Sequence, residues 1–247
     1  MARRRLPIAS PFGPTDVVRA VSEATAEILA GASVAATRDA GESAVAWVDE
    51  LCAAIQQRIP VPRPHACASG CAFCCHLKVL VTAPEVLGLA AHLRATLAKE
   101  ALDAVRARVK AVDARTHGLS MDARAGLRQP CPLLEDGRCV GYEARPASCR
   151  GANSFDAAAC EAGFSGQDVP VPLYKPQQQI AEAVRVGVSN GAMMCGLDGR
   201  PLELVAALRV ALENAGAADA WTRGRPVFER ALDAEADAMI RAMLAGG

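Results

Sequence analysis

The segment CASGCAFCCHLKVLVTAPE, residues 67–85, changes character along its length. Its first part holds Cys67, Cys71, Cys74 and Cys75, and its last part carries the pattern that starts a helix. Thiolates placed this closely repel one another unless a cation lies between them or they are oxidised. The segment therefore indicates a cysteine-rich site attached to a helical scaffold.

The helical scaffold is predicted from both sides of this segment. Thr82 and Glu85 have the spacing of a capping box, and apolar residues at helical intervals then predict one long helix over residues 83–115. Similar patterns predict helices over residues 15–36, 42–59, 176–188, 201–214 and 226–244. Only residues 77–82 resemble a strand. We expect a mostly α fold, a helical scaffold with an irregular cysteine-rich metal-binding insertion and little or no β structure.

The domain organisation follows from the breaks in this pattern. Prolines at positions 60, 62 and 64 end a helix and lead the chain into the cysteines in an extended form. We expect an N-terminal arm and helices over residues 1–62 and a cysteine-cluster region over 63–164. C-terminal helices over 165–247 would pack on the same core, so that the whole chain is one domain.

A second group of cysteines lies in CPLLEDGRCVGYEARPASCR, residues 131–150, and consists of Cys131, Cys139 and Cys149. The predicted long helix separates it from the first group. The two groups meet only if the chain reverses, and Gly118 or Gly126 is the expected place. We therefore expect the helical scaffold to close both groups onto one site.

Composition favours metal over disulfides. A chain of 247 residues can bury a sufficient core without covalent cross-links. The arginines near the N-terminus are not followed by an apolar run, as a secretory signal requires, and no apolar stretch reaches the roughly 20 residues of a membrane helix. We expect a cytoplasmic protein, and in a reducing compartment clustered cysteines bind metal or react.

Charge and aromatic content bear on partners. The chain has 27 basic and 27 acidic residues, and aromatic residues make up only 4%. Neither an electrostatic surface for nucleic acid or anionic membrane nor a base-stacking platform is expected. The sequence leaves open whether the protein has a protein partner or substrate, and it does not indicate the oligomeric state.

The spacing of the cysteines bears on the metal. Structural zinc sites pair two short Cys-x2-Cys knuckles, and only Cys71 and Cys74 have that spacing. Seven thiols also exceed the needs of one zinc ion, and Cys160 would supply an eighth. A polynuclear centre, either an iron–sulfur cluster or a multi-zinc site, uses them better, and we favour iron–sulfur over zinc. Adjacent Cys74 and Cys75 point in different directions, so they are not expected to chelate one mononuclear ion together.

Other polar residues are expected around this centre. Arg145 and Arg150 are expected to donate hydrogen bonds to sulfur and to offset the negative charge, and Tyr142 to pack over the site. His65 and His76 flank the first group and are expected to bond nearby carbonyls or thiolates, and metal ligation is the alternative for both.

Two remaining cysteines receive a structural interpretation. Cys52 lies among apolar residues of a predicted helix, and Cys195 lies in the segment GAMMCGLDG. A buried free thiol behaves there as a small apolar side chain.

The whole pattern, C-x3-C-x2-CC followed by CP-L-L, G-x-C, Tyr142, Arg145-Pro146 and Cys149-Arg150, resembles the YkgJ-like cysteine-cluster family. The resemblance covers about residues 67–150 and includes Pro132. It implies a zinc- or iron-chelating domain. Gly141 departs from it, since an aliphatic residue is usual there. Larger proteins with this kind of domain are associated with lysine methylation of flagellin, and this chain looks too short for that whole arrangement.

The spacing of Cys67, Cys71 and Cys74, with Phe73 before the last, is also similar to that of radical S-adenosylmethionine enzymes. In that family the motif follows the first strand of a βα barrel. This chain shows no alternation of strands and helices, which argues against that chemistry.

The sequence thus predicts a cytosolic metal-binding protein in which clustered thiolates hold an iron–sulfur cluster or zinc. The alternative is an iron–sulfur-dependent enzyme acting on a protein or peptide substrate by redox chemistry or methyl transfer, with radical S-adenosylmethionine chemistry less favoured. No glycine-rich phosphate loop, Ser-His-Asp arrangement or telling pair of acids supports a catalytic assignment. Whether the protein is an enzyme stays open.

Overall fold

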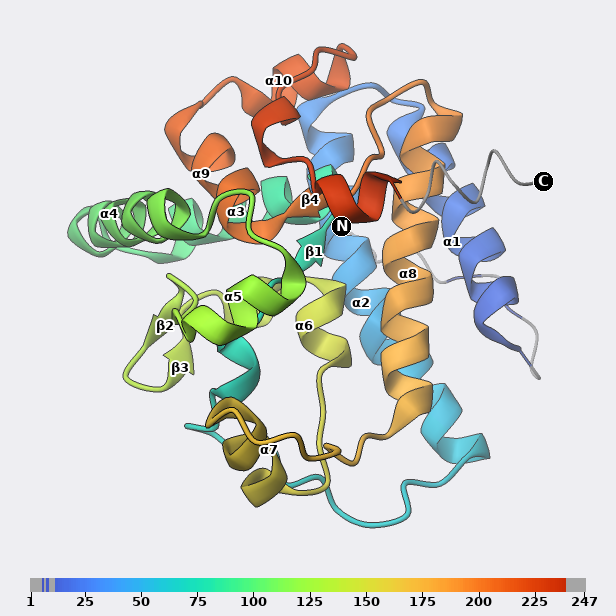
Figure 1. Ribbon diagram of the computed structural model, residues 1–247. Helices are drawn as coiled ribbons and strands as arrows, with labels where there is room; N and C mark the ends of the chain where they lie inside the picture. Colours follow the sequence, from blue (N-terminus) through green and yellow to red (C-terminus); the bar gives the residue numbers. More distant parts are fainter. Residues whose placement is uncertain (1–5, 7, 9–11, 239–247) are drawn as a thin grey trace.

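The computed structural model describes residues 6, 8 and 12–238. Three long helices, α1 (Pro14–Leu29), α2 (Val34–Arg58) and α8 (Lys175–Met194), lie side by side in one half of the molecule (Figure 1). Small residues let α1 and α8 approach closely. A Cβ atom added at Gly191 would lie 2.5 Å from the Cβ of Thr25, so only glycine fits there.

The other half is built from α3 (Ala83–Thr96), α4 (Lys99–Thr116) and α9 (Leu204–Glu213), with α10 (Ala217–Thr222) beside α9. Their apolar faces share a core that includes Leu89, Val105, Leu208 and Trp221. The two halves join where α2 crosses α3. A Cβ at Gly41 would lie 2.3 Å from the carbonyl oxygen of Pro84, so the two backbones are in contact.

The predicted long helix over residues 83–115 is wrong in one respect, because it is two helices. Leu97 adopts an extended conformation with φ −94° and ψ 139°, which ends α3 before α4 begins at Lys99. The partly buried side chain of Leu97 packs against the core. The break turns α4 so that it packs against α9.

Several predicted boundaries are also corrected. The helix predicted over residues 15–36 ends at Leu29, and α2 begins at Val34 because Ser33 caps it by accepting a hydrogen bond from the Ala36 N–H at 3.1 Å. The helix predicted over 176–188 extends to Met194. The helix predicted over 201–214 starts later, after a short strand.

The last predicted helix, over residues 226–244, does not begin at residue 226. A 3-10 turn, η3 (Glu229–Ala231), comes first, and Leu232 then forms a β-bridge with Leu202. This bridge requires an extended backbone and delays the helix to residue 234. Residues 239–244 of that prediction, and most of the predicted N-terminal arm, lie outside the described residues.

The β structure is small, and the mostly α fold is confirmed. In the described part of the chain, β1 (Leu80–Val81) pairs antiparallel with β4 (Leu202–Glu203), and β2 (Leu134–Glu135) pairs antiparallel with β3 (Arg138–Cys139). These isolated pairs form no βα barrel. None of the described helices combines the length and the apolar composition needed to cross a membrane.

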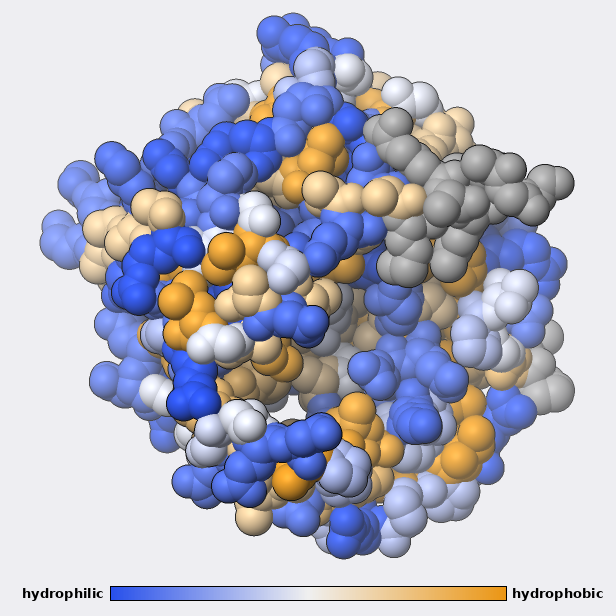
Figure 2. All heavy atoms as spheres, viewed as in Figure 1, coloured by the Kyte–Doolittle hydropathy of each residue, from blue (hydrophilic) through white to orange (hydrophobic). Residues whose placement is uncertain are grey.

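Short elements carry the cysteine-rich region. They are the 3-10 helices η1 (Phe73–His76) and η2 (Tyr142–Ala144) and the helices α5 (Met121–Leu127), α6 (Ala147–Gly151) and α7 (Ala157–Phe164). The hairpin β2–β3 and α7 lie below α4 and α5 in Figure 1. In the space-filling view, this face is hollowed where Figure 1 shows the space between α6 and α7 (Figure 2).

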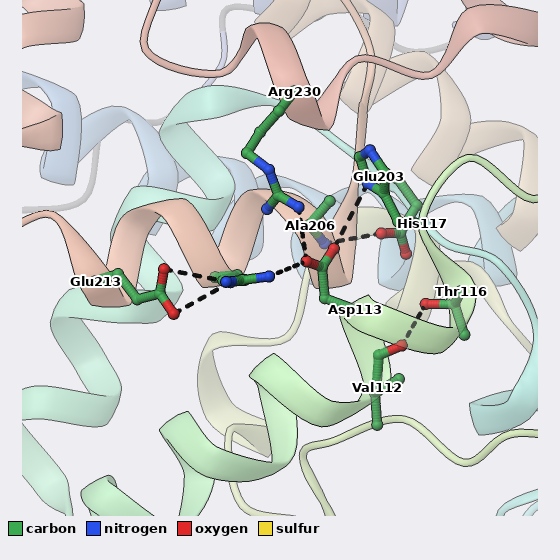
Figure 3. Close-up of polar contacts among 9 residues, drawn as sticks. Val112, Asp113, Thr116, His117, Glu203, Ala206, Glu213 and Arg230 are labelled. Atoms are coloured by element: carbon green, nitrogen blue, oxygen red, sulfur yellow. Dashed lines mark hydrogen bonds and ion pairs between the residues drawn. The ribbon is translucent and has the colours of Figure 1, made fainter.

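A buried ion cluster fixes the far side of the second core (Figure 3). The Asp113 carboxylate is fully buried and lies 2.8 Å from guanidinium nitrogens of both Arg209 and Arg230, with His117 at 3.7 Å. Burial raises the pKa of Asp113, but the hydrogen bonds from the two arginines outweigh it and hold that pKa below its ordinary value. The cluster therefore ties α4, α9 and η3 together.

Candidate metal centre

The structure brings the two cysteine groups together. After α4 the chain reverses at Gly118, where φ is +72°, and α5 leads it back. The Cys131 N–H then donates a hydrogen bond of 2.8 Å to the Cys75 carbonyl. Cys75 and Cys131, which are 56 positions apart in the sequence, are therefore adjacent in the fold. The helical pattern of the sequence does not by itself predict this neighbourhood.

The hairpin β2–β3 positions Cys139. Leu134 pairs with Cys139, and the turn between the strands consists of Asp136 and Gly137, both with positive φ. Asp-Gly is the favoured dipeptide for such a two-residue turn. The letters EDGR at residues 135–138 are the local signal from which this hairpin could have been predicted. The turn also packs on the first cysteine loop, since a Cβ on Gly137 would lie 3.4 Å from Gly70.

Helix α6 carries Cys149 and is held by Glu85. The Glu85 carboxylate accepts hydrogen bonds from the Thr82 N–H and hydroxyl, each 2.8 Å, and from the Ala147 N–H at 2.8 Å. The predicted capping box is therefore present, and the same carboxylate also holds the start of α6. The Ser148 hydroxyl donates to the Leu80 carbonyl at 2.7 Å and fixes the adjacent position.

Four cysteines form what we call the inner set: Cys75, Cys131, Cys139 and Cys149. They lie close enough to interact electrostatically: Cys131 with Cys139, and Cys149 with both, while Cys75 interacts with Cys131 and Cys149. Burial is the main cause that raises the pKa of Cys131, to about 12, and it also raises the pKa of Cys149 and Cys139. A bound cation would reverse this effect, because metal ligation requires the thiolate.

The other four cysteines form the outer set: Cys67, Cys71, Cys74 and Cys160. Cys67 interacts with each of the other three, and its thiol donates a long hydrogen bond, 3.9 Å, to the Ser154 carbonyl. Cys67 and Cys74 are exposed. The structure thus places Cys160, the eighth candidate, beside the first cysteine of the motif.

Helix α7 reaches the outer set through aromatic contacts. The Phe164 ring lies 5.7 Å from Phe73 and 4.7 Å from His76, measured between ring centroids. These contacts dock α7 on η1 and so carry Cys160 to Cys67. The His76 ring nitrogen Nδ1 lies 3.1 Å from the Ala72 carbonyl oxygen, the kind of bond expected from the sequence.

Cys74 and Cys75 connect the two sets. Their thiols are hydrogen-bonded to each other, which lowers the pKa of Cys74 and raises the pKa of Cys75. Cys74 also interacts with Cys67 on one side and with Cys149 on the other.

Arg145 lies beside these thiols. Its guanidinium interacts with Cys74, Cys139 and Cys149, and it stacks on the Tyr142 ring with the guanidinium carbon 4.0 Å from the centroid. The buried Nε atom of Arg145 has no hydrogen-bond partner within the described part of the chain. This is the position expected of a cation that serves thiolates.

Arg150, assigned the same role from the sequence, is placed differently. Its guanidinium donates to both carboxylate oxygens of Asp49 at 2.8 Å and to the Glu143 and Arg145 carbonyls. Arg150 therefore ties α6 to α2 and fixes the backbone of Arg145. Its side-chain hydrogen bonds in the described part of the chain go to oxygen atoms, not to a thiol.

Arg124 is a further residue near the thiols that the sequence does not predict. It is only 2% exposed, interacts with Cys131 and Glu203, and donates a hydrogen bond of 2.6 Å to the Gln129 carbonyl. Its Nε atom is buried and, among the described residues, without a partner. A single arginine on the short helix α5 leaves no pattern in the sequence that marks it.

The remaining candidates make other contacts. His65 stacks on Phe155, with ring centroids 5.2 Å apart, and its buried Nε2 atom has no hydrogen-bond partner among the described residues, so the expected bond to a carbonyl or thiolate is not made through that nitrogen. Cys52 is buried in the core of α1, α2 and α8, and the Cys195 thiol donates to the Ala26 carbonyl at 3.3 Å. All the cysteines of the chain lie in the described residues and are free thiols.

The donor set fits a thiophilic metal. Soft thiolates select zinc, copper(I) and iron–sulfur clusters, and eight cysteines that could supply them lie between residues 67 and 160. Within residues 6, 8 and 12–238, no three His, Cys, Asp or Glu side chains are already arranged to hold a metal ion. Two buried guanidinium nitrogens beside the inner set are available to donate hydrogen bonds to ligated sulfur.

Gly141, the departure from the family pattern, has a structural reason. A Cβ at this position would lie 2.8 Å from a methyl group of Leu89 and 3.6 Å from Leu133 and Leu93. The leucines of α3 thus fill the space that a larger residue would occupy, and the backbone of η2 packs directly on them.

Comparison with family models agrees with this site. Residues 66–164 match the CxxCxxCC family, described as a "putative zinc- or iron-chelating domain". The matched range contains every cysteine of the inner and outer sets and extends to the end of α7. Comparisons with curated proteins and with solved structures gave no match. Residues 66–164 of this chain thus match the model of the same cysteine-cluster family that the sequence pattern resembles.

Proposed function

We propose that this protein binds an iron–sulfur centre through the thiolates of its inner and outer cysteines and works in a reducing compartment such as the cytoplasm. The observation that carries the proposal is the hydrogen bond between Cys131 and Cys75. This backbone hydrogen bond joins the two cysteine groups across 55 intervening residues. The joined groups together contain more thiols than one zinc ion binds.

The choice of iron–sulfur over zinc is supported by the surroundings. Hydrogen bonds to sulfur and nearby charge set the reduction potential of such clusters. Arg145 and Arg124 each place a buried Nε beside the inner thiols. When bound, an iron–sulfur centre supplies one-electron chemistry. The protein's own residues would hold the sulfur ligands, offset their charge and limit access of water from the α3 side.

The test is anaerobic purification followed by metal and sulfide analysis. We expect a brown protein that contains iron and acid-labile sulfide, with absorption near the visible bands of such clusters. A colourless protein with stoichiometric zinc would refute the iron–sulfur assignment and leave metal binding intact. Cys149→Ser should lose metal, whereas Cys52→Ser should keep it, since Cys52 lies in the distant core of α1, α2 and α8. Equal metal loss in both would refute the ligand assignment.

A further inference from the structure

We propose that Asp233 is a positioning residue for the cysteine-rich site, because its ion pair with Lys78 fixes the segment that follows η1. This inference rests on the proposed metal binding. It adds that the C-terminal segment, residues 232–237, holds the cysteines in the arrangement that takes up metal.

The ion pair between Lys78 and Asp233 is buried. The Lys78 Nζ atom lies 2.5 Å from Asp233 Oδ2, and the two side chains are 7% and 3% exposed. Asp233 Oδ2 has no hydrogen bond among the described residues, so the lysine is what offsets its charge. A buried charge without a partner is strongly unfavourable, and the two side chains therefore stay together in the folded chain.

Lys78 lies where the cysteine-bearing segment enters the core. It is three residues after Cys75 and two residues before Leu80, which begins β1. β1 pairs with β4 over only two residues, and so short a ladder specifies its own register weakly. A slip of one residue would move Cys75 by about 3.3 Å. The ion pair adds a fixed point on the cysteine side of the ladder.

Asp233 is itself held by the backbone around it. Its N–H donates to the Pro201 carbonyl at 3.0 Å, and its Oδ1 atom accepts a hydrogen bond of 2.9 Å from the Ala236 N–H. The preceding residue, Leu232, forms the β-bridge with Leu202 of β4. The carboxylate is therefore a fixed point at the edge of the small β structure, where Figure 1 shows the red C-terminal segment beside β4.

The C-terminal segment also contacts the arm that leads to Cys131. The Glu235 carboxylate accepts a hydrogen bond of 3.2 Å from the N–H of Met121, the first residue of α5, and lies 3.5 Å from Lys78 Nζ. The Glu235 side chain is 57% exposed, so this contact is weaker than the buried pair. The C-terminal segment thus contacts both arms whose ends meet in the hydrogen bond between Cys131 and Cys75.

Positioning can be distinguished from stabilisation at this ion pair. Replacing both partners of a buried ion pair with uncharged residues of similar volume often leaves stability unchanged or raises it, whereas removing one partner is destabilising. If the pair only stabilised the fold, the double replacement would preserve both stability and metal binding. Because the pair positions η1, we expect the double replacement to preserve stability but not metal binding.

The experiment uses the full chain, stripped of metal under reducing anaerobic conditions, with Co²⁺ as the probe. Thiolate-bound Co²⁺ absorbs strongly, and competition with a chelator gives its affinity. Lys78→Met together with Asp233→Asn should unfold at a urea midpoint close to that of the wild type. This double variant should bind Co²⁺ at least about 10-fold more weakly and with a changed visible spectrum. Asparagine keeps the acceptor for the Ala236 N–H.

Three further variants complete the set. Lys78→Arg retains the ion pair and should bind Co²⁺ as the wild type does. Gly191→Ala strains the contact of α8 with α1, so it should lower the urea midpoint and keep the Co²⁺ affinity. Asp233→Asn alone is measured in case the double variant does not fold, since Lys78 then keeps Glu235 at 3.5 Å as a counter-charge. This single variant should also lose Co²⁺ affinity.

The contrary outcomes are distinct. Wild-type Co²⁺ affinity and spectrum in the folded double variant, or in Asp233→Asn if the double variant is unfolded, would overturn the positioning role and leave metal binding intact. An equal loss of affinity in Gly191→Ala would also overturn it, because the effect would then follow stability alone. A wild type that takes up no thiolate-bound Co²⁺, zinc or iron would overturn the proposed function and this inference with it.

Discussion

Glu85 is the residue whose replacement tests the construction of the site most directly. Its carboxylate is 3% exposed and accepts three hydrogen bonds of 2.8 Å: two from Thr82, which caps α3, and one from the Ala147 N–H, which starts α6. Glu85→Ala would remove the acceptor for all three donors. It would also release the short helix that carries Cys149.

The expected magnitude follows from these contacts. A buried donor left without an acceptor costs about 1–3 kcal/mol, and the Thr82 hydroxyl can rotate to another acceptor. Two backbone donors therefore remain without an acceptor, which places the loss of unfolding free energy at about 2–6 kcal/mol. An N-cap alone contributes only about 1 kcal/mol. The loss of unfolding free energy beyond that of an N-cap measures the contribution of the Glu85–Ala147 hydrogen bond, which links α3 to α6.

The assay is urea denaturation of the metal-free chain, with Co²⁺ uptake measured in parallel. Ser33→Ala is the matched control, because Ser33 caps α2 through one bond and touches no second element in the contacts described. We expect a large loss of stability in Glu85→Ala together with weaker Co²⁺ binding, and a small loss with normal binding in Ser33→Ala. Equal losses in both variants would refute the reasoning.

Three further predictions concern other parts of the chain. Asp113→Asn should cost about 2 kcal/mol, less than a fully buried pair because the arginine partners are partly exposed. Since the folded-state pKa of Asp113 is lowered, this difference should be fully present above the ordinary value of 3.8 and be lost as the pH falls through the lowered folded-state pKa, measured by urea denaturation across pH. Gly191→Ala should lower the melting temperature through its clash with α1, whereas Gly126→Ala, with open space around it on α5, should gain up to about 1 kcal/mol. Arg145→Gln should weaken Co²⁺ binding by roughly 10-fold in competition titrations, while the exposed Arg138→Gln should leave it unchanged; equal effects would contradict the charge argument.

Local signals in the sequence were sufficient for several features. Helices with strong apolar periodicity were predicted as helices, and the capping box at Thr82 and Glu85 is present. These features depend on residues within one or two turns of each other. Boundaries failed where tertiary packing competes with periodicity, as at Leu97, whose extended backbone divides the predicted long helix into α3 and α4.

The sequence alone determined that this chain is mostly helical and carries a family pattern of clustered thiols, because periodicity and cysteine spacing are local properties. Only the tertiary structure decided how the thiols are grouped. The hydrogen bond between Cys131 and Cys75 joins segments that are distant in the chain, and so do the electrostatic interactions of Cys67 with Cys160 and of Arg124 with Cys131. Such neighbours depend on how α4 turns back and where α6 and α7 dock, and those positions are set by packing against the whole core.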